Sequence, residues 1–243
     1  MRGRVVTLAG GLLLAACGGG GGGLSEEEAD DAVEAALDAA ADELDLDEAD
    51  DDSGARDLLD AVVATDVDDA TRERLAATLR EVAAELRVAR RDPVIVLVRE
   101  ADGRVNNYTQ AGCGPLNPRA PELRFEPFPP PPTPDAEFRP VEVVGHCTLD
   151  ASFGGGPGRA HGGAVAGLFD EALGRANVAA GLSGMTVALE VRFRAGAPLG
   201  VPLRVTARCD RVDGRKRFPS GELWHGATLI AEAHAVYVTQ ATR

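Results

Sequence analysis

The stretch GPGRAHGGAVAGLFDEALGRA, Gly156–Ala176, decides the fold. Apolar residues recur within it at spacings of three and four, which places them on one face of a helix over residues 163–180. These residues are Val165, Leu168, Phe169, Ala172, Leu173 and Ala176. His161 and two glycines precede the helix, and an acid pair, Asp170 and Glu171, interrupts the apolar run. We therefore expect a helix with one buried face and with polar groups near its start and middle.

Predicted strands lie on both sides of this helix in the sequence. Alternating apolar residues predict a strand at 141–149 and further strands at 186–193 and 203–209. The Asp-Gly pair in Val212–Arg215 favours a tight hairpin turn, and two more strands follow near 218–225 and 228–239. The sequence thus predicts an α+β fold in which a five-stranded antiparallel sheet wraps one long central helix.

The rest of the chain divides by composition into segments 1–23, 24–54, 55–92 and 93–137, ahead of the domain at 138–243. The formal net charge of −14 comes from Ser25–Asp52, which contains fifteen carboxylates and neither Lys nor Arg. This segment either forms a loose helix or stays disordered through self-repulsion. The remainder is nearly neutral and lacks a basic stripe with interleaved aromatics, so we expect no nucleic-acid partner.

The N-terminal segment MRGRVVTLAGGLLLAAC has a basic start, a short apolar run and small residues before Cys17. It looks like a bacterial lipoprotein signal, although its apolar run is too short to span a bilayer. The alternative is a low-complexity upstream extension. Attachment to a membrane is expected only if Cys17 is lipidated.

Residues 55–92 predict two helices separated by a break, and Asp92-Pro93 ends the second helix. We expect a helical hairpin here; a coiled-coil partner site is less favoured because the apolar stripe is short. Residues 93–137 then hold a buried strand, VIVLV, and a stiff proline-rich connector.

Cys147 and Cys209 occupy apolar strand positions, which favours buried thiols. No cluster has metal-ligand spacing, and we expect no metal and no other cofactor.

Three stretches resemble a known family: GRAHGGAVAGLFDEALG, MTVALEVRFRAGAPLGVPLRVTARCDRVDGRK and GELWHGATLIAEAHAVYV. Over about residues 138–240 the chain resembles the hotdog-fold thioesterases of the PaaI-like acyl-CoA group. The His-Gly-Gly sequence, the acid nine residues after the histidine and the helix rich in small residues match in order. The resemblance implies a cytoplasmic acyl-CoA thioesterase that assembles as a homodimer or a dimer of dimers.

The residues themselves suggest how a thioester could be hydrolysed. The carbonyl oxygen needs charge stabilisation, which backbone N–H groups at the helix start supply, and Gly162 and Gly163 lie there. Asp170 is the expected base or nucleophile, because its neighbours on that side are small and should form a groove. These neighbours are Gly163, Ala166, Gly167, Gly174 and Asn177. Glu171 is expected to be a solvated acid paired with Arg175.

The resemblance assigns further roles. It implies that His161 shapes the oxyanion loop and that Thr186 reaches Asp170 from the partner subunit. At Gly155 the chain departs from relatives, which often carry Asn or Gln in this loop. Cations for the CoA phosphates are expected among residues at strand ends: Arg192, Arg194, Arg215, Lys216 and Arg217.

Two other classes of function remain open. One is an exported lipoprotein whose hotdog body binds acyl groups without catalysis, which lipidation at Cys17 would favour. The other is a hotdog dehydratase or hydratase, which would need His161 as its base.

Overall fold

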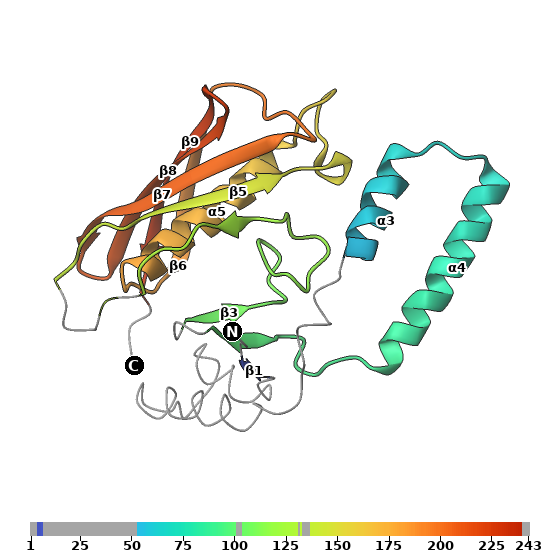
Figure 1. Ribbon diagram of the computed structural model, residues 1–243, viewed down its shortest axis with the longest axis horizontal. Helices are drawn as coiled ribbons and strands as arrows, with labels where there is room; N and C mark the ends of the chain where they lie inside the picture. Colours follow the sequence, from blue (N-terminus) through green and yellow to red (C-terminus); the bar gives the residue numbers. More distant parts are fainter. Residues whose placement is uncertain (1–3, 7–52, 101–103, 131, 133–136, 240–243) are drawn as a thin grey trace.

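The computed structural model describes residues 4–6, 53–100, 104–130, 132 and 137–239. Its main body is an antiparallel sheet that curves around helix α5 (Gly162–Ala179), as Figure 1 shows. The strand order is β4-β5-β7-β8-β9-β6. The strands are β4 (Arg124–Phe125), β5 (Glu142–Thr148), β6 (Met185–Phe193), β7 (Pro202–Asp213), β8 (Lys216–His225) and β9 (Thr228–Val238).

The expectation of an α+β hotdog architecture is confirmed, but the sheet has six strands rather than five. The additional strand, β4, pairs Arg124 with His146 and Phe125 with Gly145. Two residues are too few to show the apolar alternation that marks a strand in a sequence. They form β4 only because β5 offers them an edge to pair with.

The core lies between the inner face of the sheet and the apolar face of α5. The residues predicted from the helical spacing are all buried, and Phe169, Ala172 and Leu173 are completely so. Alternate residues of β7, among them Leu203 and Val205, meet them from the sheet. Because burial of apolar surface is the main driving force of folding, this contact fixes α5 on the sheet.

Strand β6 lies at one edge of the sheet and contains a bulge. It pairs with β9 through Thr186↔Tyr237 and Ala188↔Val236, which leaves Val187 as the extra residue. A shift of one residue turns a strand's side chains to the opposite face. The bulge therefore lets Leu189 and Val191 pack towards the core while Thr186 also faces inward, opposite Tyr237.

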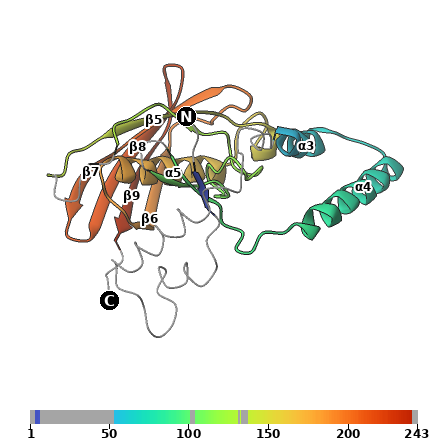
Figure 2. The ribbon, with the colours of Figure 1, turned by 60° about the horizontal axis from the view of Figure 1, so that its bottom comes forward.

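The N-terminal part is attached to this body at its side. A three-stranded sheet contains β1 (Arg4–Val6), β2 (Leu97–Arg99) and β3 (Val105–Asn107). Helix α3 (Ser53–Ala64) lies against the 3-10 turn η1 (Ala151–Phe153), where Ala151 N donates to Asp60 Oδ1 at 2.8 Å. Helix α4 (Asp69–Val88) has no buried residue and stands away from the sheet in Figure 2. The two helices form where expected, but they do not pack against each other as the expected helical hairpin would (Figure 1), and the apolar stripe of α4 stays exposed.

Some expectations fall on residues that the structure does not describe. Cys17, most of the signal-like segment and nearly all of the acidic segment lie outside the described residues. Within the described ranges, no helix is long and apolar enough to cross a membrane. Cys147 and Cys209 are buried free thiols, as their strand positions predicted.

Candidate active site

The start of α5 is shaped by His161, which is the N-cap of the helix. Its Nδ1 accepts a hydrogen bond from Gly163 N at 2.9 Å, and its own N–H donates to Phe153 O at 2.8 Å. An accepting Nδ1 puts the proton of the neutral ring on Nε2. The expectation that the Gly163 N–H helps to stabilise the carbonyl oxygen was therefore wrong, because the histidine side chain already accepts its hydrogen bond.

The Gly162 N–H, in contrast, has no hydrogen-bond partner in the described part of the chain. It is an unsatisfied donor at the positive end of the helix dipole, which suits a developing oxyanion. A Cβ at this position would lie 3.3 Å from Cζ of Phe193, so a larger residue would press against that ring. Gly162 is thus the backbone donor that remains for a substrate carbonyl.

The departure at Gly155 has a steric cause. A Cβ there would lie 2.7 Å from Cα of His161 and 3.0 Å from its N, both backbone atoms. The loop is held in this path because Gly155 N donates to Arg159 O at 2.8 Å. An Asn or Gln therefore cannot occupy this position without moving the helix start.

Asp170 is half-buried and hydrogen-bonded to two strands of its own chain. Thr186 Oγ1 donates to Asp170 Oδ1 at 2.7 Å. Tyr237 Oη donates to the Asp170 main-chain O at 2.7 Å and lies 3.2 Å from Oδ1. Among the described residues no donor to Asp170 Oδ2 is found, so this oxygen is available to a water or a substrate. The expectation that Thr186 reaches Asp170 from a partner subunit was wrong, because the bulge in β6 turns it inward within the same chain.

Tyr237 lies at the site, but the sequence patterns did not predict it as a site residue. It is buried, and burial raises the pKa of its phenol, so it remains a protonated donor near neutral pH. The signal was present in the sequence, because the alternation of AHAVYV points Tyr237 to the core face, where its hydroxyl needs a partner. Only the register of β9 shows that the partner is Asp170.

Glu171 is not the solvated acid that was expected. Its carboxylate accepts from Gln110 Nε2 at 2.6 Å and from Cys113 Sγ at 3.2 Å, and burial raises its pKa. Arg175 donates to Asn106 Oδ1 at 2.6 Å instead of pairing with Glu171. The connector covers this face of α5, and helical spacing alone could not reveal that.

The groove beside Asp170 is only partly as expected. A Cβ at Gly167 would meet no atom within 4 Å, so this side of α5 is open, and Gly174 lies beside the Tyr237 hydroxyl. Asn177 does not belong to the groove: it is only 2% exposed. Its side-chain N and O have no hydrogen-bond partner in the described structure.

The candidate CoA-binding cations lie at two places. Arg192 donates to Glu190 and Arg194 to Glu232, at the Phe193 end of β6. Arg215, Lys216 and Arg217 lie at the β7–β8 hairpin, where Arg217 is opposite Tyr237 in the register. Within one chain these two groups are at opposite ends of β6. Among the described residues, no three His, Cys, Asp or Glu side chains gather as metal ligands.

Comparison with known proteins identifies the class that this fold and site define. The family model of the thioesterase superfamily matches residues 157–232. A crystal structure described as a thioesterase superfamily protein is 30% identical, with a TM-score of 0.64, covering 82% of this chain and 92% of that one. The chain therefore belongs to the thioesterase superfamily. This confirms the predicted hotdog thioesterase class and supports thioester hydrolysis as the general reaction.

Two further similar structures have lower scores. One is the PaaI protein of E. coli, at 21% identity and TM-score 0.39, covering 40% of this chain and 76% of that one. The other is a hypothetical thioesterase from Streptococcus pneumoniae with coenzyme A, at 18% identity and TM-score 0.42. It covers 50% of this chain and 91% of that chain.

Proposed function

We propose that this protein hydrolyses acyl-CoA thioesters to a free acid and CoA, with Asp170 as the reacting carboxylate. The observation that carries this proposal is the one-sided hydrogen bonding of Asp170. Thr186 donates to its Oδ1 and the Tyr237 hydroxyl lies 3.2 Å from the same oxygen, which fixes the carboxylate and leaves Oδ2 for a water. A carboxylate held in this way is suited to take a proton from a water that faces the open groove at Gly167.

In this reaction Asp170 removes a proton from water while the water oxygen attacks the carbonyl carbon. The Gly162 N–H binds the resulting oxyanion, supported by the dipole of α5. The C–S bond then breaks, and the proton passes from Asp170 to the departing CoA sulfur. In the alternative route Asp170 attacks the carbonyl directly and the CoA thiolate leaves as the C–S bond breaks. Water then hydrolyses the resulting mixed anhydride, which releases the free acid and restores the Asp170 carboxylate, while the proton from water goes to the thiolate.

One chain cannot bring the Gly162 N–H and the Asp170 carboxylate to the same substrate carbonyl. Gly162 and Asp170 are eight residues apart on α5, a distance of about 12 Å along the helix axis. The oxyanion donor and the base must each lie within about 3 Å of the groups they contact. This separation supports a homodimer in which Asp170 of one copy acts with the partner's Gly162.

Strand β6 suggests how the two copies meet. It is an edge strand of the six-stranded sheet, and Met185, Val187 and Phe193 on it are 60%, 61% and 54% exposed. One end of β6 lies beside Asp170 and the other beside Gly162. If two β6 strands pair antiparallel about a two-fold axis, each Asp170 comes next to the partner's Gly162.

The same pairing would bring the two groups of cations together. Arg215, Lys216 and Arg217 share the Asp170 end of the sheet, and Arg192 and Arg194 share the Gly162 end. Each site in the dimer would therefore have one group from each copy, which suits the phosphates of CoA. Two such dimers could associate further into a dimer of dimers.

The direct test is a free-thiol assay over a panel of acyl-CoAs. Asp170→Asn changes the charge with little change in volume, and we expect turnover to fall at least about a hundredfold. Asp213→Asn, which removes an exposed hairpin carboxylate paired with Arg211, is the matched control and should keep wild-type turnover. Glu171→Gln should also have little effect. Wild-type turnover in Asp170→Asn would reject Asp170 as the reacting carboxylate. A loss of about a hundredfold in Glu171→Gln would move that assignment to Glu171.

Complementation between two inactive variants tests the shared site. Gly162→Pro deletes the N–H, and the helix backbone tolerates it because proline is favoured at the first helical position and His161 before it is extended. Its Cβ would lie 3.3 Å from the Phe193 ring, which is 54% exposed and can move away from it. Co-refolding Gly162→Pro with Asp170→Asn should regain about a quarter of wild-type activity, since half of the dimers then have one intact site. Asp170→Asn with Thr186→Val should regain nothing, because both residues belong to the same half-site. The reverse pattern, or an active monomer in light scattering, would overturn the arrangement.

The alternatives can be separated with the same protein. A dehydratase would need His161 as a base, but its Nδ1 already accepts from Gly163 N. Acyl-CoA binding without thiol release would favour a non-catalytic acyl-binding role. A CoA substrate favours a cytoplasmic location, and cell fractionation with the mass of the mature N-terminus tests this against lipidation at Cys17.

A further inference from the structure

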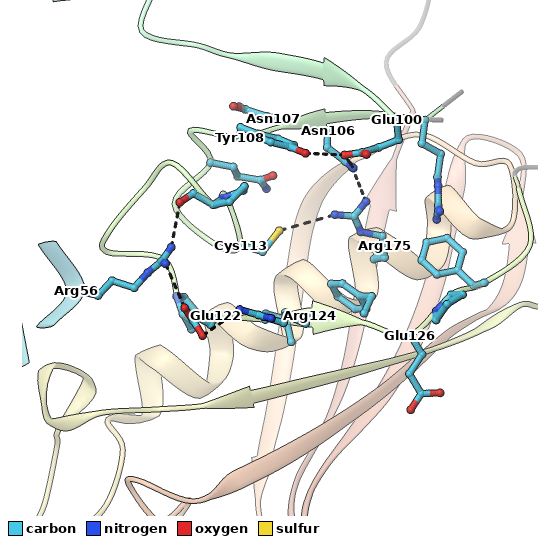
Figure 3. A pocket seen from close by; sticks show the side chains of 18 residues that line it. Arg56, Glu100, Asn106, Asn107, Tyr108, Cys113, Glu122, Arg124, Glu126 and Arg175 are labelled. Carbon is cyan, nitrogen blue, oxygen red and sulfur yellow. Dashed lines mark hydrogen bonds and ion pairs between the residues drawn. The ribbon is translucent and has the colours of Figure 1, made fainter. Parts of the chain in front are cut away.

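A cavity of about 730 Å³ lies beside Arg175 of α5 (Figure 3). It is lined by β3 and the turn after it, by the connector from Cys113 to Phe128, and by Arg175 of α5. Arg175 stands five residues after Asp170, so the two side chains leave the helix about 140° apart. Asp170 contacts β6 and β9, whereas Arg175 lies over Phe125 of β4 at the opposite edge of the sheet. The cavity is therefore separate from the groove at Asp170.

The cavity wall carries an excess of positive charge in a chain that is acidic as a whole. Its charged residues are Arg56, Arg104, Arg124 and Arg175, with Glu100, Glu122 and Glu126. Glu126 bonds to His146 at 2.7 Å and points away from the other labelled side chains in Figure 3. Glu122 is shared by Arg56 at 3.4 Å and Arg124 at 3.7 Å. Glu100 accepts from Asn106 and Tyr108, so none of the three acids forms an ion pair with Arg175 in the described structure.

Arg175 is the cation whose contacts within the described residues are all neutral. It donates to Asn106 Oδ1 at 2.6 Å and to Cys113 Sγ at 3.9 Å. Glu171, the nearest acid on its own helix, accepts hydrogen bonds from Gln110 and Cys113 and forms no ion pair with Arg175. Burial raises the pKa of this carboxyl, and the charge of Arg175 lowers it by a smaller effect. A guanidinium that is partly buried without an anion is a favourable binding site for one.

The apolar part of the wall lies next to this guanidinium. Cζ of Arg175 is 5.2 Å from the centroid of the Phe125 ring, and Cζ of Arg104 is 4.0 Å from that of Phe128. Stacking on a ring holds a guanidinium while its N–H edge stays open to an acid group. Leu123 and Pro127 extend this apolar surface.

We propose that the cavity beside Arg175 binds a small organic carboxylate, with its acid group on the Arg175 guanidinium and its apolar body against Phe125 and Leu123. A single guanidinium that forms no ion pair among the described residues matches the charge of a carboxylate better than that of a phosphate. A planar carboxylate also fits the two parallel N–H groups of arginine. The site is distinct from that of hydrolysis, and its occupancy does not depend on Asp170.

Calorimetric titration of the full chain tests this proposal. The probes are hexanoate and benzoate, each compared with its neutral amide. Wild-type protein should bind the carboxylates at one site per chain and the amides at least about tenfold more weakly, because the amides lack the charge. Asp170→Asn should bind the carboxylates like the wild type, which separates this cavity from the groove of the proposed reaction.

Arg175→Gln should weaken carboxylate binding about tenfold or more, because the charge-assisted pair is lost. Arg211→Gln is the matched control: Arg211 also stacks on a ring, Phe218, but it pairs with Asp213 on an exposed hairpin, so binding should be unchanged. Arg175→Lys keeps the charge without the planar fork and should give an intermediate loss. It also serves as the test if thermal melting shows that Arg175→Gln does not fold.

Three outcomes would overturn the proposal. The first is equal affinity of the wild type and both Arg175 variants for the carboxylates. The second is equal affinity of the wild type for acid and amide. The third concerns adenosine 3′,5′-bisphosphate: if it binds through Arg175 while the carboxylates do not, the cavity is a phosphate site instead.

Discussion

Helices α4 and α5 are similar in the sequence and opposite in the structure. α4 has 20 residues and α5 has 18, and both carry apolar residues at spacings of three and four. The apolar face of α5 is buried under the sheet, whereas α4 has no buried residue, and Leu86 on it is 70% exposed. Helical periodicity therefore predicted both helices equally well but did not predict which one is covered.

The largest difference between the two helices is expected in stability. Phe169→Ala on α5 removes a ring that is 0% exposed and should lower the free energy of unfolding by about 3–5 kcal/mol. Leu79→Ala on α4 removes a side chain that is 37% exposed and should cost less than about 1 kcal/mol. Urea denaturation followed by circular dichroism measures both. A comparable cost for Leu79→Ala would mean that α4 is buried in the assembled protein.

A smaller effect is expected where β9 meets α5. Tyr237→Phe keeps the ring in the core but removes the donor to the main-chain O and Oδ1 of Asp170. We expect kcat for acyl-CoA hydrolysis to fall by about tenfold with little change in KM, since a hydrogen bond to a charged group contributes about 1.5–3 kcal/mol.

Tyr108→Phe is the matched control for this substitution. Tyr108 donates to Glu100 at 3.0 Å, away from Asp170, so its loss should leave kcat unchanged. If Tyr237→Phe changes only the melting temperature, Tyr237 is a core residue and does not position Asp170.

The smallest effect on activity is expected from removing α4 together with α3 and the residues before it. A chain that begins at residue 93 lacks α3 and α4 but keeps α5 and the whole six-stranded sheet. Its kcat/KM should stay within about twofold of the full chain, because α5 and the sheet provide the reacting groups. Its stability should fall, since the contacts of Arg56 with Pro115 O and of Asp60 with Ala151 N are lost.

Circular dichroism must first show that this shortened protein is folded. A folded protein that has lost its activity would show that the N-terminal part contributes to the site.

The sequence predicted the body of the fold because its signals are local. The apolar spacing around Phe169 requires only a helix with one buried side, and the alternation of the long strands requires only a sheet with one buried face. His161, Gly162 and Asp170 could be chosen for the same reason, since a helix start and a helix face are defined by nearby residues. The short strand β4 was missed because two residues show no period.

Contacts between distant segments were decided by the tertiary structure alone. The bulge at Val187 turns Thr186 inward, which moved its contact with Asp170 from a partner copy to the same chain. Gln110 and Cys113 cover Glu171, and Tyr237 bonds to Asp170. These contacts join residues about sixty positions apart or more. Such contacts depend on register and packing, which local residue patterns do not specify. The sequence by itself determined the long helices and strands and the candidate residues on α5, and the packing of the sheet on α5 determined which side chains meet there.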